Sequence, residues 1–224
     1  DNQWVLDLVK HNPDRYIGLV GSLPIGTDEF AGLLNRFAAE KRFVGLRMRQ
    51  RPGGEDFFTD AVWRDLQLMA DKGLTLDVLM SKFDLEDVSL IAERMPDLKI
   101  LINHLTGLII TGEPAAEEWT AAVKKAASYP NVHCKVSGIF QRSGQSPAPK
   151  NLSYYEPIFK VVYDAFGEDR IIYGSNWPVT DRGGEYDEQL NVIQKFFQPM
   201  GHSVLEKLFW KNASKFYGVK LNND

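Results

Sequence analysis

The sequence lacks the features that would direct it to a membrane, to nucleic acid or to a disulfide-stabilised fold. It holds one cysteine, Cys134, among 224 residues, which excludes an intrachain disulfide and a zinc site built from cysteines. No run of about 18 apolar residues occurs, so no transmembrane helix is expected. The net charge of -4 provides no basic surface for nucleic acid or an anionic membrane. We expect a small-molecule substrate as partner, with a cytoplasmic location as the default and an oligomer possible.

The composition is that of a globular protein with a sizeable core. Hydrophobic residues make up 44% of the chain and charged residues 25%. The length fits one domain, and no linker or shift in composition divides residues 1–224. Cys134 lies inside the apolar run 132–136, where a cysteine is far more often a buried small hydrophobe than a nucleophile.

Short apolar runs alternate with amphipathic segments along the whole chain. The predicted strands cover 16–23, 43–49, 74–80, 99–105, 131–139 and 170–176. The predicted helices, with apolar residues three and four apart, cover 27–40, 61–72, 84–95, 115–128, 154–166 and 185–197. This alternation is typical of βαβ units and a parallel sheet, either a doubly wound open sheet or part of an eight-stranded barrel.

The two faces of the predicted strands favour the barrel. In the strand 131–139, positions 132, 134 and 136 are apolar, whereas 133, 135 and 137 are His, Lys and Ser. Strand 43–49 likewise alternates apolar residues with Arg47 and Arg49. One face therefore packs against helices while the other brings polar groups into a shared interior, as at the mouth of a (β/α)8 barrel of TIM-barrel type.

Four motifs resemble one family. They are Asn-His-Leu-Thr-Gly at 103–107, Lys-Val-Ser-Gly at 135–138, Tyr-Gly-Ser-Asn-Trp-Pro-Val at 173–179, and Trp-Lys-Asn-Ala-Ser-Lys-Phe-Tyr-Gly at 210–218. Together they resemble the amidohydrolase-related, metal-dependent hydrolases of TIM-barrel fold, in the lactonase-like branch that includes sugar lactonases and the pyrone-dicarboxylate lactonase. The resemblance implies an α/β fold in which this chain supplies strands three to eight of the barrel.

The sequence departs from this family at two points. The family begins with a strand carrying His-x-His, whereas the four histidines here are isolated. We therefore expect an N-terminally incomplete barrel domain over 1–224, lacking roughly 50 to 60 residues by the spacing of its βα units. The second departure is Asn176, where most family members have an Asp that acts as general base or metal ligand.

The resemblance implies that His104 and Asn176 are the catalytic residues, and each ends a predicted strand at the barrel mouth. A neutral His104 can polarise a carbonyl group, or ligate a metal if the missing segment supplies further ligands. Asn176 cannot act as a base because an amide has no titratable site, although it can position water. Asp181 is the nearest replacement base, but it is more consistent with an ordinary loop residue. The cofactor is thus either a divalent metal such as zinc or none.

Four further residues are predicted to bind substrate. Arg47 and Arg49 share a strand face and offer bidentate recognition of a carboxylate, which the resembled lactonases bind near this strand. Lys135 needs a partner in the interior, and an ion pair with Asp77 is as consistent with the sequence as a substrate contact. Trp177 either forms a wall for the substrate or packs over the barrel rim.

The leading hypothesis is a hydrolase that opens a lactone or other cyclic ester of a carboxylated small molecule. An alternative is a catalytically impaired barrel that binds a small carboxylate, since neither His-x-His nor the usual acid at position 176 is present. A third hypothesis is an aldolase or decarboxylase that forms a Schiff base through Lys135. The polar loop 141–150 follows a strand and is a candidate lid.

Overall fold

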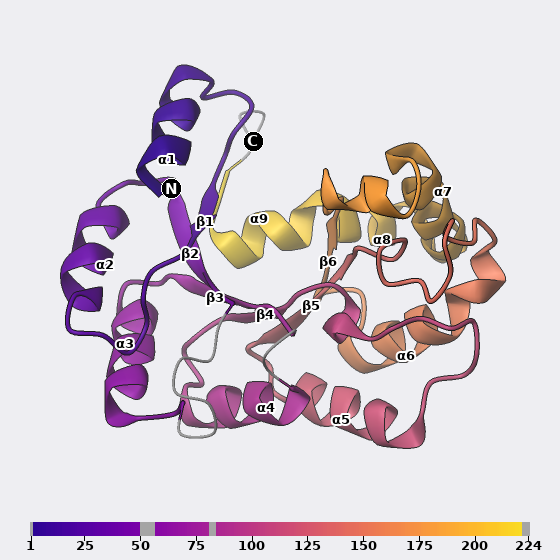
Figure 1. Ribbon diagram of the computed structural model, residues 1–224, viewed down its shortest axis with the longest axis horizontal. Helices are drawn as coiled ribbons and strands as arrows, with labels where there is room; N and C mark the ends of the chain where they lie inside the picture. The colour runs from indigo at the N-terminus through magenta and orange to yellow at the C-terminus, as the bar shows by residue number, and fades with distance from the viewer. Residues whose placement is uncertain (1, 50–56, 81–83, 221–224) are drawn as a thin grey trace.

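The protein is a six-stranded parallel sheet that curves into an open barrel (Figure 1). The computed structural model describes residues 2–49, 57–80 and 84–220. The strands are β1 (Leu19–Gly21), β2 (Phe43–Met48), β3 (Thr75–Val78), β4 (Ile100–Ile102), β5 (Val132–Ser137) and β6 (Ile171–Gly174). Each strand pairs with the next in sequence, and within the described residues β1 and β6 do not pair with each other. The predicted incomplete barrel of TIM-barrel type is therefore confirmed.

Each predicted helix is present and follows its strand. The helices before the carboxyl-terminal region are α1 (Asn2–His11), α2 (Phe30–Ala38), α3 (Asp60–Asp71), α4 (Leu85–Arg94), α5 (Glu117–Ser128), α6 (Glu156–Phe166) and α7 (Tyr186–Phe197). Side-chain caps define where two of them begin. Thr59 Oγ1 accepts from the backbone N–H of Val62 at the start of α3, and Asp84 forms a capping box with Asp87 at the start of α4.

The two faces of the strands differ as the sequence predicts. In β5, Val132, Cys134 and Val136 are buried in the core shared with the outer helices. Burial raises the pKa of the Cys134 thiol to about 12, so this cysteine behaves as a core residue. His133 and Lys135 on the opposite face are half-buried and point into the barrel interior. The register places Arg47 of β2 opposite Asp77 of β3, so their side chains share this inner face.

The carboxyl-terminal helix lies on the inner side of the sheet. After α8 (His202–Glu206) and a π-helical segment (Lys207–Lys211), α9 (Asn212–Tyr217) runs across the concave side, opposite the outer helices (Figure 1). Phe216 packs there against Leu101 and Ile172, and its ring centroid is 4.7 Å from that of His133. The barrel interior thus receives side chains from the end of the chain as well as from the strands. None of the helices described is both long and apolar enough to cross a bilayer.

Candidate active site

His104 is held in an uncommon backbone conformation directly after β4. The φ angles of His104, Leu105 and Thr106 are 54°, 47° and 63°, in the left-handed region that non-glycine residues rarely adopt. This turn ends the strand and places the imidazole inside the barrel mouth, where it is 7% exposed. Its Nδ1 lies 2.8 Å from the hydroxyl oxygen of Ser137, at the end of the neighbouring strand β5. One ring nitrogen is therefore engaged by the protein, which fixes the orientation of the ring.

Asn176 meets His104 across Gly138. Asn176 also has a left-handed backbone, with a φ of 56°. A β-carbon on Gly138 would lie 3.1 Å from Asn176 Nδ2 and 3.3 Å from His104 Nδ1. The two predicted catalytic side chains thus converge on one point, and the absence of a side chain at Gly138 leaves room for them. Asn176 Nδ2 donates a hydrogen bond to Gln141 Oε1, which leaves the Asn176 Oδ1 as an acceptor for water.

The electrostatic surroundings keep His104 neutral. Burial, and then the positive charges of Lys135, Arg47 and Arg142, lower the pKa of His104 to about 3. At neutral pH the imidazole therefore has one N–H and one lone pair. If Ser137 donates to Nδ1, the proton lies on Nε2, which can donate to a carbonyl oxygen; if Nδ1 donates to Ser137, Nε2 can accept a proton or ligate a metal.

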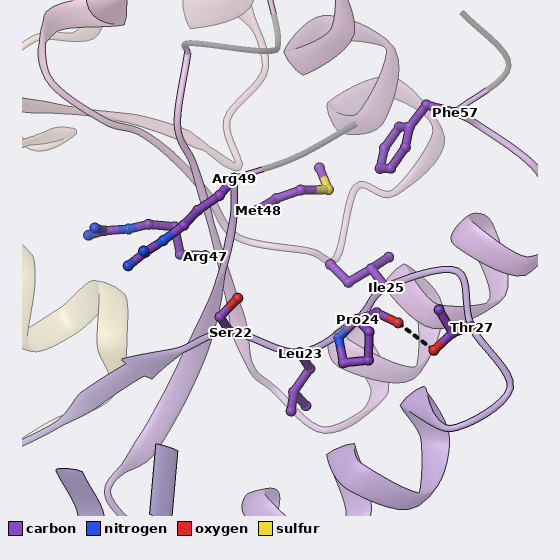
Figure 2. A pocket seen from close by; sticks show the side chains of 9 residues that line it. All are labelled: Ser22, Leu23, Pro24, Ile25, Thr27, Arg47, Met48, Arg49 and Phe57. Atoms are coloured by element: carbon purple, nitrogen blue, oxygen red, sulfur yellow. Dashed lines mark hydrogen bonds between the residues drawn. The ribbon is translucent and has the colours of Figure 1, made fainter. Parts of the chain in front are cut away.

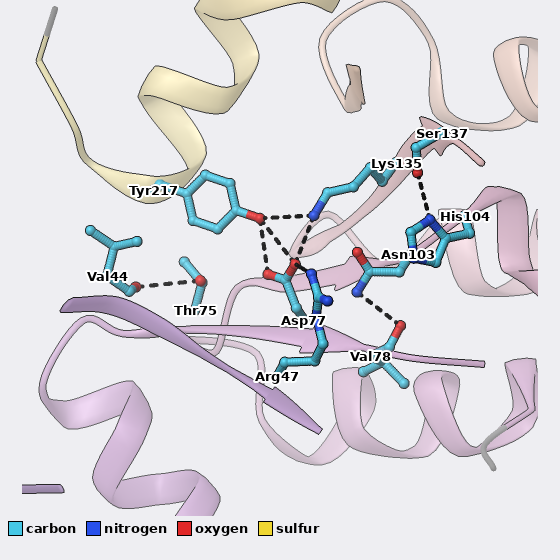
Figure 3. Close-up of polar contacts among 10 residues, drawn as sticks. All are labelled: Val44, Arg47, Thr75, Asp77, Val78, Asn103, His104, Lys135, Ser137 and Tyr217. Carbon is cyan, nitrogen blue, oxygen red and sulfur yellow. Dashed lines mark hydrogen bonds and ion pairs between the residues drawn. The ribbon is translucent and has the colours of Figure 1, made fainter. Parts of the chain in front are cut away.

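The predicted ion pair between Lys135 and Asp77 is present (Figure 3). Lys135 Nζ donates to Asp77 Oδ2 at 2.8 Å, and the Asp77 carboxylate is fully buried. The Tyr217 hydroxyl from α9 donates to the same carboxylate, 3.0 Å from Oδ1 and 3.1 Å from Oδ2. Arg47 Nη2 remains 4.0 Å from Asp77 Oδ2. Asp77 therefore gathers charged and polar groups from β2, β5 and α9 in the barrel interior.

The two predicted arginines line a cavity at the carboxyl end of β2. Its volume is 550 Å³, and its walls include Ser22, Pro24 and Ile25 from the segment after β1. Figure 2 shows Arg47 and Arg49 extending from the same side of the strand. Arg47 is half-buried and Arg49 is exposed. The cavity therefore offers two guanidinium groups beside apolar walls.

Trp177 follows Asn176 but is 66% exposed, so it does not pack over the rim. The other alternative, that Trp177 forms a wall for the substrate, stays a prediction. His133 lies deeper, and burial together with the charge of Arg170 lowers its pKa to about 4. Its ring lies against Phe216, with 4.7 Å between the centroids, which favours a structural role for His133.

Sequence reasoning missed two side chains at this site, Gln141 and Arg142. Both belong to the loop that was expected to form a lid. The Arg142 Nη1 donates to the Gly107 carbonyl at 3.0 Å, and its buried Nε has no partner among the residues that the structure describes. Ile110 and Ser143 also form a parallel bridge. The first residues of this loop are thus fastened to the turn after His104, an arrangement for which the sequence gives no local signal.

The described residues do not form a metal site by themselves. No group of three or more His, Cys, Asp or Glu side chains comes together in the ranges 2–49, 57–80 and 84–220. His104 and the Asn176 amide are the nearest candidate ligands, whereas zinc in enzymes takes three protein ligands and a water. His104 as a metal ligand therefore stays a prediction that needs ligands from elsewhere.

A curved parallel sheet of TIM-barrel type with polar side chains at its strand ends defines an α/β barrel enzyme. The model of the amidohydrolase family matches residues 1–219, and the chain belongs to this family.

The relatives agree with the lactonase-like branch. The chain is 28% identical to an L-fucono-1,5-lactonase of Burkholderia ambifaria, over 98% of this chain and 76% of the relative. A solved amidohydrolase of Burkholderia multivorans with bound zinc has a TM-score of 0.83 and 21% identity, covering 97% of this chain and 78% of that one. A putative 2-pyrone-4,6-dicarboxylic acid hydrolase of Pseudomonas putida has a TM-score of 0.74 and 20% identity, covering 97% and 77%.

Proposed function

We propose that this protein hydrolyses a lactone or other cyclic ester of a small molecule that carries a carboxylate. The convergence of His104 and Asn176 at Gly138 is the observation that carries the proposal. Similarity to an L-fucono-1,5-lactonase supports the lactone, and the charge of the barrel mouth supports the carboxylate. The positive charges of Arg47, Lys135 and Arg142 all lower the pKa of His104. The Asp77 carboxylate balances the charge of Lys135. The remaining guanidinium groups suit an anionic substrate.

In this mechanism water adds to the lactone carbonyl and the ring C–O bond breaks, giving a hydroxy acid. His104 Nε2–H donates to the carbonyl oxygen, where negative charge develops as water attacks. Asn176 Oδ1 accepts a hydrogen bond from the attacking water and orients it, and the proton that the water loses passes to the ring oxygen as the C–O bond breaks. Arg47 binds the substrate's carboxylate and so holds the carbonyl beside the imidazole. The zinc of a related structure would supply a Lewis acid, but no step here depends on it.

Turnover of a matched pair of lactones tests this proposal. The full-length protein is incubated with D-glucaro-1,4-lactone, which carries a carboxylate, and D-glucono-1,4-lactone, which does not, and acid release is followed with a pH indicator. We expect hydrolysis of both, with a higher kcat/KM for the carboxylated lactone. His104→Gln, which removes the imidazole but keeps a polar side chain, should abolish turnover while circular dichroism shows a folded protein. Full activity in this variant would refute the role of His104.

A second candidate function, favoured by the amide at position 176, is carboxylate binding without catalysis. Asn176 cannot take a proton from water, and Asp181 is exposed in the turn Val179–Arg182. Calorimetric binding of D-glucaro-1,4-lactone without any hydrolysis would support this candidate over the enzyme. The Schiff-base hypothesis is weakened by the contact of Lys135 with Asp77, because a carboxylate stabilises the ammonium form rather than the free amine. Borohydride trapping with a carbonyl substrate should leave Lys135 unlabelled.

A further inference from the structure

The Asp77 carboxylate has two oxygens with different partners. Oδ2 accepts from Lys135 Nζ and from the Tyr217 hydroxyl. Oδ1 accepts from Tyr217 alone within the described part of the chain. The Tyr217 hydroxyl therefore occupies the oxygen that would otherwise be open to another donor.

Arg47 forms a long ion pair with the same carboxylate (Figure 3). Its Nη2 is 4.0 Å from Asp77 Oδ2, beyond hydrogen-bond distance, although the two residues are opposite each other on adjacent strands. The Arg47 Nε is buried and has no hydrogen-bond partner among the described residues. A guanidinium with a buried unpaired donor beside a cavity is available to a ligand, whereas one closed onto Asp77 would have its charge neutralised.

Tyr217 can serve only as a donor to Asp77. Burial and the charge of Asp77 hold the pKa of the Tyr217 phenol far above its ordinary value, so the hydroxyl keeps its proton. The same hydroxyl is 3.3 Å from Lys135 Nζ. Tyr217 and Lys135 donate hydrogen bonds to Asp77, whereas Arg47 contributes only the longer ion pair.

We propose that Tyr217 is a positioning residue that sets the preference for carboxylated substrates, by holding Asp77 in hydrogen bonds so that the Arg47 guanidinium stays beyond hydrogen-bond distance of Asp77 and can donate to the ligand. The inference rests on the proposed function for the identity of the ligand. It makes the carboxyl-terminal helix α9 part of the substrate site, although α9 lies outside the strand ends that carry His104 and Asn176.

A structure of the Tyr217→Phe variant tests the inference without any assay of activity. The phenyl ring keeps the packing, and only the hydroxyl is lost. We expect Arg47 to move to within hydrogen-bond distance of Asp77 Oδ1. If Arg47 stays at its present distance from Asp77, the inference is wrong, whether or not the protein hydrolyses lactones.

Kinetics with the matched lactones provide the second readout. In Tyr217→Phe the KM for D-glucaro-1,4-lactone should rise about tenfold, the size expected for one charge-assisted hydrogen bond. The KM for D-glucono-1,4-lactone and both kcat values should not change. Equal losses on the two lactones would indicate a merely structural role and overturn the inference. If the wild-type protein hydrolyses neither lactone, the proposed function fails, while the Arg47–Asp77 distance still decides the inference.

Tyr173→Phe is the matched control. The Tyr173 hydroxyl is buried and interacts with Tyr186 rather than with Asp77, and its ring packs against Phe209, 4.9 Å between centroids. Removing that hydroxyl should leave both KM values and the Arg47–Asp77 distance unchanged. A change as large as that in Tyr217→Phe would show that loss of any buried phenol disturbs the site.

Discussion

Replacing Lys135 by methionine would leave Asp77 as a buried carboxylate with Tyr217 as its one remaining close donor among the described residues. Methionine keeps most of the lysine stem, so the change removes the ammonium group and little packing. Breaking a buried ion pair by removing one partner costs about 3–5 kcal/mol, because the other charge is left uncompensated. We expect the lower end of this range, because Arg47 is 4.0 Å away and can close on the carboxylate.

The double variant Asp77→Leu/Lys135→Met should be much less destabilised than the two single changes together. Removing both charges also removes the cost of desolvating them, and such replacements are often neutral. The expected interaction free energy of the double-mutant cycle is therefore at the upper end of the usual range of about 0.5–3 kcal/mol. The Tyr217 hydroxyl loses its acceptor in this variant, which costs about 1–3 kcal/mol and sets the residual destabilisation.

Urea unfolding followed by tryptophan fluorescence measures the three variants against the wild-type chain. The wild type, the two single variants and the double variant must share the same m value, so that their urea midpoints report differences in stability. Additive losses in the double variant, or a loss below about 1 kcal/mol in Lys135→Met, would refute a coupled buried pair, because exposed pairs contribute about that little.

Three further predictions concern the side chains around Gly138. The pKa of His104 is lowered from 6.5 to about 3, so between these pH values the unfolded chain binds a proton that the folded chain does not bind. The stability of the wild type relative to His104→Gln should therefore fall as the pH drops below 6.5 and level off near pH 3. A pH-independent difference in urea midpoints would contradict this. Asn176→Asp supplies a titratable base beside the water and should raise lactone turnover by about 10²-fold; an unchanged or lower initial rate would count against water at that position. Gly138→Ala places a methyl group 3.1 Å from Asn176 Nδ2 at a φ of 65°, which should cost about 1 kcal/mol and lower turnover; normal rates in the indicator assay would show that the two side chains do not act together.

Most of the fold could be predicted because the pattern of apolar residues encodes it locally. The segment predicted as a helix over 185–197 is α7 (Tyr186–Phe197), and the strand predicted over 131–139 is β5 (Val132–Ser137). Ends of strands were placed too far out, as for 16–23 against β1 (Leu19–Gly21), because apolar residues continue past the last ladder hydrogen bond. Helix α9 was recognised by its motif, but its place on the inner side depends on long-range packing, which periodicity does not report.

The site was predicted in part, for a similar reason. Arg47 and Lys135 lie on the polar faces of their strands, so an alternating face pattern was enough to bring them to one interior. His104 and Asn176 follow β4 and β6 and were identified by the motifs of the resembled family. The contact of Gln141 with Asn176 depends on the path of a loop, and that of Tyr217 with Asp77 spans 140 residues. Neither leaves a signal in local sequence. The catalytic roles of His104 and Asn176 and the substrate-binding roles of Arg47, Arg49, Lys135 and Trp177 remain predictions.

The left-handed run at His104, Leu105 and Thr106 has a consequence for engineering. Each non-glycine residue in this conformation costs about 1–2 kcal/mol, which the fold offsets by burying Leu105 and by a 2.8 Å hydrogen bond from Trp119 Nε1 to Thr106 Oγ1. Glycine at position 106 would relieve the strain of one left-handed residue, but it would also remove the hydroxyl that accepts from Trp119 Nε1. The lost acceptor costs about 1–3 kcal/mol, as much as the strain relieved, so selection for heat tolerance alone would not favour an exchange at this turn.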